Sequence, residues 1–165
     1  MRYLIQYKEI MDLSINEFLV LVEENEKIRL ADLKVKDLIY CDGCSIFPGN
    51  GIYFFYHKDQ CMYVGKCSSR SFVERIPSHF DLRNEAWMNT LLKKVSKFFN
   101  IGLEKAAKKV FFEHSLILIN FEGKNNKEII NKTESLFRKI LKPKLNSYKR
   151  DYEFELERRI KDSYL

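Results

Sequence analysis

Arg75 and His79 are a pair of residues whose types and spacing suit phosphate chemistry. They are four residues apart in a segment with helical periodicity, so their side chains project from the same helix face. Arginine stays charged and offers a planar fork of donors that matches a phosphate group. Such a pair is also common on solvated helix surfaces, so its meaning depends on the residues around it.

Glu134 is a carboxylate within an expected helix over residues 127–141. The apolar stripe of this helix comprises Ile129, Ile130, Leu136, Phe137, Ile140 and Leu141. On a helical wheel Glu134 lies about 20° from Leu141, at the edge of that stripe. A carboxylate half-withdrawn from water favours a cation as its partner. That cation is either a lysine, in a structural ion pair, or a divalent metal ion.

Tyr53 and Tyr63 fall on two expected strands, residues 52–56 and 61–64, which are joined by a hairpin. If the loop is the three residues 57–59, the two tyrosines pair and both phenols stand on one face. A loop of two residues puts them on opposite faces. The alternative to a shared site is that both are ordinary strand aromatics in a chain with 9 tyrosines.

The elements that must position these side chains are a hairpin, helices and one further strand. Helices are expected over residues 71–80, 85–99, 103–110 and 127–141, with Pro77 near the end of the first and Pro143 after the last. Residues 115–121 lack alternation, which predicts a central strand covered on both faces. This order predicts the α/β class: a small sandwich with a three-stranded, mostly antiparallel sheet flanked by helices.

The expected helix over residues 85–99 is amphipathic. Its apolar side comprises Trp87, Leu91, Leu92, Val95, Phe98 and Phe99. Its outward side carries Lys93, Lys94 and Lys97.

Residues 1–48 are expected to form an acidic, mainly helical N-terminal extension, with a capping box from Ser14 to Glu17. The main domain is placed at 49–150, with a helical insertion at 81–110, and a terminal helix at 151–165. Cys41 and Cys44 form a C-x-x-C pair without a second such pair, so reduced thiols at a turn are favoured over a structural metal.

Positive charge is concentrated in one segment. Residues 86–150 hold 15 Lys and Arg against 5 Asp and Glu, whereas residues 1–50 hold 6 against 9. A basic segment inside a folded domain suits binding to a phosphate backbone, although a solvated lysine-rich surface gives the same pattern. The candidate DNA contacts are Lys93, Lys94, Lys97, Lys142 and Lys144.

No apolar run approaches the roughly 20 residues of a membrane-spanning helix. Residues 1–13 lack the pattern of a signal peptide. We expect a soluble cytoplasmic protein that does not contact a membrane.

Together these residues resemble the GIY-YIG nucleases, a family that includes excision-repair, homing and restriction endonucleases. The resemblance covers roughly residues 50–148 and follows the order of the expected elements. The matching residues are Gly51-Ile52-Tyr53, Tyr63-Val64-Gly65-Lys66, Arg75, His79, Glu134 and the segment from Pro143 to Asn146. Val64 replaces the commoner isoleucine, and the segment between His79 and the third strand is long, so substrate recognition is not carried over.

The resemblance implies hydrolysis of a phosphodiester with one divalent metal, Mg²⁺ or Mn²⁺, held by Glu134. Arg75 would stabilise charge on the phosphate, and either Tyr53 or Tyr63 would help take a proton from the attacking water. An unperturbed phenol has a pKa of about 10, so this role needs a nearby cation, for which Lys66 is adjacent.

The same resemblance implies that His79 orients a partner or relays a proton, and that Asn146 braces the site. The expected function is a metal-dependent DNA endonuclease, of sequence-specific restriction type. The alternatives are a repair or mobile-element nuclease that nicks particular DNA structures, and a non-catalytic DNA-binding module. Cutting both strands implies a homodimer or sequential nicks, and the acidic N-terminal helices are candidates for contact with another protein.

Overall fold

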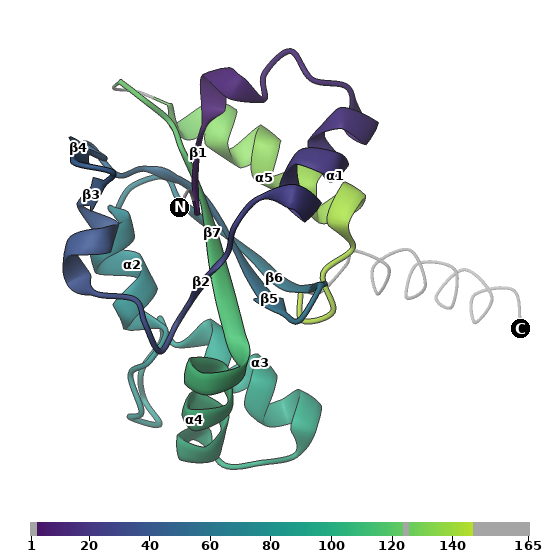
Figure 1. Ribbon diagram of the computed structural model, residues 1–165. Helices are drawn as coiled ribbons and strands as arrows, with labels where there is room; N and C mark the ends of the chain where they lie inside the picture. The colour runs from purple at the N-terminus through teal and green to yellow at the C-terminus, as the bar shows by residue number, and fades with distance from the viewer. Residues whose placement is uncertain (1–2, 124–125, 147–165) are drawn as a thin grey trace, which may run out of the picture.

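The computed structural model describes residues 3–123 and 126–146 and shows a mixed α/β protein (Figure 1). The main sheet of the described residues has five strands in the order β1-β7-β5-β6, and β2 also pairs with β7. Its strands are β1 (Leu4–Gln6), β2 (Ile28–Arg29), β5 (Gly51–His57), β6 (Gln60–Cys67) and β7 (His114–Asn120). The α/β class predicted from the sequence is therefore confirmed.

The helices are α1 (Ile15–Glu24), α2 (Phe72–Ser78), α3 (Thr90–Phe99), α4 (Leu103–Glu113) and α5 (Lys127–Leu141). Short 3₁₀ segments are η1 (Tyr7–Glu9) and η2 (Val35–Leu38), and β3 (Tyr40–Cys41) and β4 (Cys44–Ser45) form a separate hairpin. The four cysteines are free, and no described helix has the length and apolar character needed to cross a membrane. The helix predicted for residues 151–165 lies outside the described residues.

β7 is the strand around which the sheet is assembled. It runs antiparallel to β5 over its whole length, antiparallel to β2 and parallel to β1. Every residue of β7 except Ser115 is buried, which explains why its sequence has no alternation of apolar and polar residues. The predicted central strand is confirmed.

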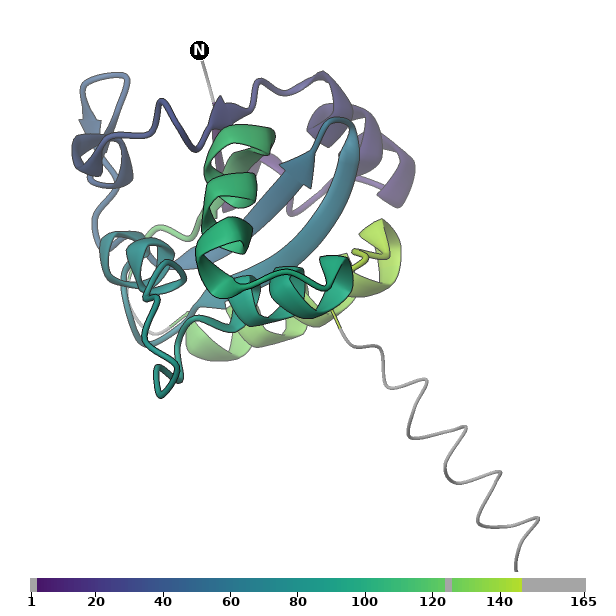
Figure 2. The same ribbon diagram turned by 90° about the horizontal axis from the view of Figure 1, so that it is seen from below.

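Two apolar clusters cover the two faces of the sheet. Tyr53 and Phe55 face the first cluster, which includes buried residues of α2, α3 and α4. Ile52 and Phe54 face the second, which includes buried residues of α1 and α5. Figure 1 shows α1 and α5 on one side of the sheet, and Figure 2 shows α4 in front of the β5 and β6 hairpin. Alternation along β5 thus divides its side chains between two layers.

The prediction of a three-stranded sheet was wrong, because residues 1–40 contribute two strands as well as a helix. β1 pairs with β7 from Leu4 to Gln6, and β2 pairs with it through Ile28 and Arg29. The capping box at Ser14 and Glu17 opens α1 as predicted. The strands were missed because they are only three and two residues long and carry no measurable period. The predicted domain boundary near residue 49 stays a prediction.

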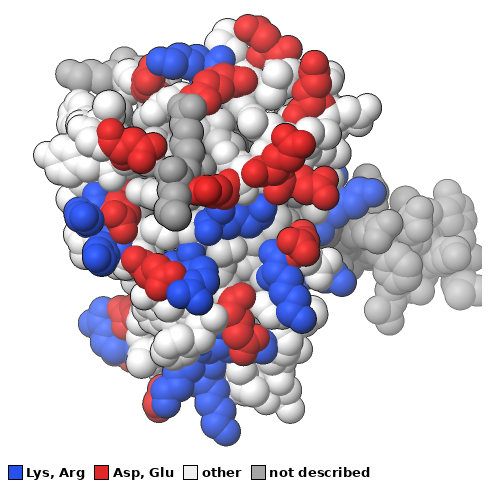
Figure 3. Space-filling view, in the orientation of Figure 1, with Lys and Arg blue, Asp and Glu red and all other residues white. Residues whose placement is uncertain are grey.

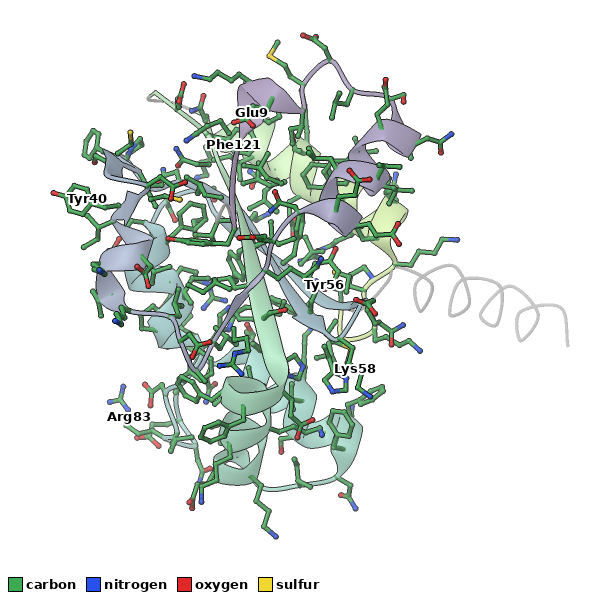
Figure 4. All side chains as sticks on the ribbon, viewed as in Figure 1. Glu9, Tyr40, Tyr56, Lys58, Arg83 and Phe121 are labelled. Carbon is green, nitrogen blue, oxygen red and sulfur yellow. The ribbon has the colours of Figure 1, made fainter. Side chains whose placement is uncertain are left out.

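The β5 and β6 hairpin turns through two residues, Lys58 and Asp59, with His57 paired to Gln60. Lys58 adopts a positive φ of 53°, as turns in tight hairpins require. Tyr56 and Lys58 mark this end of the hairpin in Figure 4. The expected three-residue loop over residues 57–59 therefore does not form.

A β-bulge nevertheless places both tyrosines on one face. The register shifts beyond the turn, so Phe55 pairs with Tyr63, Tyr53 pairs with Gly65, and Met62 is left between ladder pairs. The extra residue in β6 reverses the effect of the two-residue loop. The expectation that such a loop separates Tyr53 and Tyr63 was wrong because it assumed an uninterrupted ladder.

Two further expectations about helices were wrong. Residues 85–89 are not helical, since α3 begins at Thr90, and Trp87 is exposed instead of packed. In α5, whose bounds match the prediction, Ile129 and Leu136 are exposed, while Ile130 and Phe137 are buried. The apolar stripe is narrower than predicted: Phe137 packs against Phe18 of α1 and Phe54 of β5, and Ile129 and Leu136 are left in solvent.

We predict that unfolding free energy falls as the pH is lowered from 6.5 toward 4. Burial lowers the pKa of His114 from 6.5 to about 4, so the unfolded chain binds a proton in this range that the folded chain excludes. The contribution of His114 to stability is thus fully present above pH 6.5 and is lost as the pH falls from 6.5 toward 4. Urea unfolding at several pH values should show a shallower loss for His114→Asn, and an unchanged slope would contradict the prediction.

Candidate active site

A cleft of about 380 Å³ opens beside β6, at one edge of the sheet. It is lined by Tyr53, Tyr63, Gly65, Lys66, Cys67, Ser68, Ser69, Arg70, Arg75, Trp87, Met88, Thr90, Glu134 and Arg138. Five of the seven predicted catalytic residues line it. The other two, His79 and Asn146, are buried behind it and contact residues of β5 and β6.

Tyr53 and His79 form a buried hydrogen-bonded pair with 2.7 Å between Oη and Nε2. The backbone N–H of Leu91 donates to Nδ1 of His79 at 3.3 Å. Burial, and then the charge of Arg75, hold the pKa of His79 well below its usual range. The neutral ring therefore carries its proton on Nε2, and this N–H donates a hydrogen bond to the Tyr53 oxygen.

That tautomer fixes the direction of the Tyr53 hydroxyl. Burial raises the pKa of Tyr53 well above its ordinary value, so the phenol is protonated at neutral pH. Its oxygen accepts a bond from His79, so its own hydrogen is available for an acceptor in the cleft. His79 thus orients Tyr53 rather than removing its proton.

Arg75 is held in place by three acceptors around the cleft. Its Nη1 donates to Oγ of Ser78 at 2.9 Å and to the carbonyl oxygen of Met88 at 2.7 Å. Its Nη2 donates to Oγ1 of Thr90 at 3.1 Å, and the same Oγ1 lies 3.4 Å from Oη of Tyr63. The guanidinium group is therefore oriented before any anion arrives, which lowers the entropy cost of binding one.

Gly65 is required by the close approach of the Tyr53 ring. A Cβ at Gly65 would lie 2.2 Å from Cζ and 2.3 Å from Oη of Tyr53. The phenol therefore lies across β6 in the space that a side chain would occupy. This contact gives a physical reason for glycine two positions after Tyr63.

Asn146 completes the hydrogen bonding of β6 at its outer edge. The Val64 backbone N–H donates to Oδ1 of Asn146, and Nδ2 donates to the Val64 carbonyl oxygen, both at 2.8 Å. The Leu145 backbone N–H also donates to the Met62 carbonyl oxygen at 2.8 Å. The segment after α5 therefore pairs with β6 like a short strand and fixes the backbone between Tyr63 and Gly65.

Glu134 projects from α5 toward the cleft, and 3% of its surface is exposed. One carboxylate oxygen lies 3.4 Å from Nζ of Lys66, and the other is ion-paired with the guanidinium group of Arg138. A lysine was one of the two partners expected for Glu134 from the sequence, the other being a divalent metal ion. Both cations are more than a third exposed, whereas the carboxylate is enclosed.

A carboxylate is a donor that a divalent metal accepts, although both oxygens of Glu134 are paired with cations in this structure. Within residues 3–123 and 126–146 there is no cluster of three or more His, Cys, Asp or Glu side chains suited to a metal. Mg²⁺ commonly binds through one or two carboxylates together with waters and substrate phosphates. Glu134 is a single carboxylate of this kind in a cleft lined by cations, and it would hold such an ion.

The candidate DNA lysines divide into two groups. Four are exposed: Lys93, Lys97, Lys142 and Lys144. Lys94 does not face outward as predicted, because its Nζ donates to the Leu145 carbonyl oxygen at 2.9 Å, and burial lowers its pKa. Figure 3 shows acidic side chains gathered over the region of α1, and lysines and arginines among carboxylates around α4. Through its bond to Leu145, Lys94 supports the segment that carries Asn146 and is not a candidate for DNA contact.

Several residues of the cleft were not identified from the sequence. Arg138 follows Glu134 by four positions, and that spacing on a helix was a readable signal for the pair. No such signal marked Arg70, Trp87 and Thr90. They lie before α2, between α2 and α3 and at the start of α3, and they meet at the cleft only after folding.

Comparisons with models of protein families, with curated proteins and with solved structures gave no match. The assignment of chemistry therefore depends on the geometry of the cleft and on the resemblance of its motif.

We predict that Gly65→Ala destabilises the fold and displaces the Tyr53 ring. Overpacking of this kind typically costs about 1–3 kcal/mol. Gly102→Ala is the control, because a Cβ at Gly102 meets no atom within 4 Å. Thermal unfolding should show a large loss for the first variant and a small one for the second, and equal losses would contradict the close approach.

Proposed function

We propose that this chain is a divalent-metal-dependent endonuclease that hydrolyses DNA phosphodiester bonds by chemistry of the GIY-YIG type. The observation that carries the proposal is the composition of one cleft. It brings together two phenols, the cations Lys66, Arg70, Arg75 and Arg138, and a single buried carboxylate. Four cations around one carboxylate leave the cleft positive overall, as a phosphodiester requires.

Arg75 is the residue that we assign to the phosphate. Its guanidinium group lines the cleft and is already fixed by Ser78, Met88 and Thr90. A fixed cation stabilises charge that develops on phosphate oxygens without reorganising during the reaction. A metal ion held by Glu134 would supply Lewis-acid stabilisation of the same charge.

The two phenols are assigned to the nucleophilic water. Tyr53 is protonated and presents its O–H hydrogen to the cleft, which suits orientation of the water or of a phosphate oxygen. Tyr63 lies on the same face, with its ring 6.3 Å from that of Tyr53, and lines the same cleft. One of the two takes part in removing the water proton.

DNA is the proposed substrate because exposed lysines lie on segments that adjoin the cleft. Lys93 donates to the Ala86 carbonyl oxygen at 2.5 Å and so stands beside the loop that carries Trp87. Lys142 and Lys144 follow α5 and are exposed. A phosphate backbone that extends beyond the cleft could bind these charges.

Glu134→Gln is the test of this function. The full chain is incubated with supercoiled plasmid and either Mg²⁺ or Mn²⁺, with EDTA as the metal-free reference. Cleavage should fall by about 10²- to 10³-fold in the variant, because it loses the charge that a hard divalent cation needs. DNA binding measured in EDTA should be retained or become tighter.

Glu128→Gln is the matched control, since it removes one carboxylate from an exposed ion pair with Lys132 on the same helix. It should cleave at the parent rate. If Glu134→Gln lowers the melting temperature but keeps full turnover per folded molecule, Glu134 is a structural partner of Lys66 and Arg138, and the metal assignment is wrong.

Tyr53→Phe and Tyr63→Phe should differ in stability although both rings are kept. Tyr53→Phe leaves a buried His79 N–H without its acceptor, which costs about 1–3 kcal/mol. Tyr63→Phe loses only a 3.4 Å contact with Thr90 and should unfold near the parent temperature. At least one variant should lose about 10²- to 10⁴-fold in single-turnover cleavage. Parent rates in both would remove the phenols from the mechanism.

A further inference from the structure

Trp87 is a large aromatic side chain that the fold leaves in solvent at the rim of the cleft. It is 74% exposed and lines the same cleft as Tyr53, Arg75 and Glu134. It is also the single tryptophan of the chain. An indole usually buries most of its area, so exposure at this position suits a contact with a ligand.

The backbone around Trp87 is fixed by hydrogen bonds on both sides. The preceding carbonyl oxygen, of Ala86, accepts from Nζ of Lys93 at 2.5 Å, and the following one, of Met88, accepts from Arg75 at 2.7 Å. Asn89 is fully buried and its Nδ2 donates to the Asp81 carbonyl oxygen at 2.7 Å. Arg83, in the same segment, extends into solvent in Figure 4. The indole is thus held outward by a supported loop.

Arg70 places its guanidinium group over the indole ring of Trp87. Its guanidinium carbon lies 5.7 Å from the centre of the Trp87 ring, and it comes from the segment between β6 and α2. The pair therefore joins the two walls of the cleft. An exposed indole with a guanidinium group over its ring offers a stacking surface for a nucleobase and a cation for its phosphate.

We propose that Trp87 and Arg70 form a stacking site for an unpaired nucleobase next to the phosphodiester in the cleft. The inference rests on the proposed function and defines its substrate class as DNA with an unpaired or extruded base beside the cut. Trp87 is joined directly to Met88, whose carbonyl oxygen binds Arg75, so the stacking surface and the phosphate site share one rigid segment. A base within a continuous duplex presents only its edges and could not stack on the indole.

Tryptophan fluorescence tests the site directly, because Trp87 is the single tryptophan of the chain and all indole emission comes from it. The full chain in EDTA is titrated with three labelled oligonucleotides: a paired duplex, the same duplex with one unpaired base, and a single strand. Anisotropy of the label measures binding, while indole emission reports stacking. The unpaired substrates should quench the emission and bind about 10- to 100-fold more tightly than the duplex.

Trp87→Ala should abolish that preference and leave the affinity for the paired duplex unchanged. Arg70→Gln should reduce the preference only in part. Phe112→Ala is the control, because Phe112 is also 74% exposed but does not line the cleft. It should leave the preference intact.

Emission that stays unchanged while the labelled strands bind would overturn the stacking site. The stacking site would also be overturned if Trp87→Ala kept the parent's preference for unpaired substrates. A change in the mass of this variant in solution would overturn it too, because the indole would then be assigned to self-association. Quenching without cleavage in Mg²⁺ or Mn²⁺ would refute the nuclease proposal alone. Failure of every oligonucleotide to bind would refute both.

Discussion

The pairing of β5 with β6 controls the geometry of the cleft. A two-residue turn sets the register at one end, and the bulge at Met62 then shifts it by one residue. Tyr53 consequently faces Gly65, which has no side chain, and its ring extends over β6 to meet His79 and approach Tyr63. Without the bulge the phenols would lie in different layers of the protein, on either side of a sheet whose faces pack against separate helices.

The cleft forms where the sheet ends, and this position explains how residues of both layers meet. β6 is the edge strand, so α5 from one layer and the segment before α3 from the other both reach its outer side. Glu134 and Arg75 therefore share a cleft although their helices cover opposite faces. The cost of an edge strand is its unpaired backbone, and Asn146 and Leu145 satisfy part of it.

The cleft has four cations, Lys66, Arg70, Arg75 and Arg138, around the one enclosed carboxylate of Glu134. Glu134 is enclosed by Lys66 and Arg138, whose own side chains reach the solvent. The ion pairs compensate the buried charge of Glu134, and the phosphodiester of the proposed function would compete for the same cations. A divalent metal would replace part of that compensation. In the proposed function the same carboxylate would therefore stabilise the fold and also hold the metal.

The sequence by itself determined the elements with long, clear patterns: the hairpin, the buried strand β7 and the bounds of α5. It also brought forward Tyr53, Tyr63, Lys66, Arg75 and Glu134, whose types and spacing are local properties, and all five line one cleft. Tertiary structure alone decided the bulge, the short strands β1 and β2, and the exposure of Trp87. Each of these depends on pairing or packing between segments far apart in the chain, where the local free-energy differences are too small to leave a periodic signal.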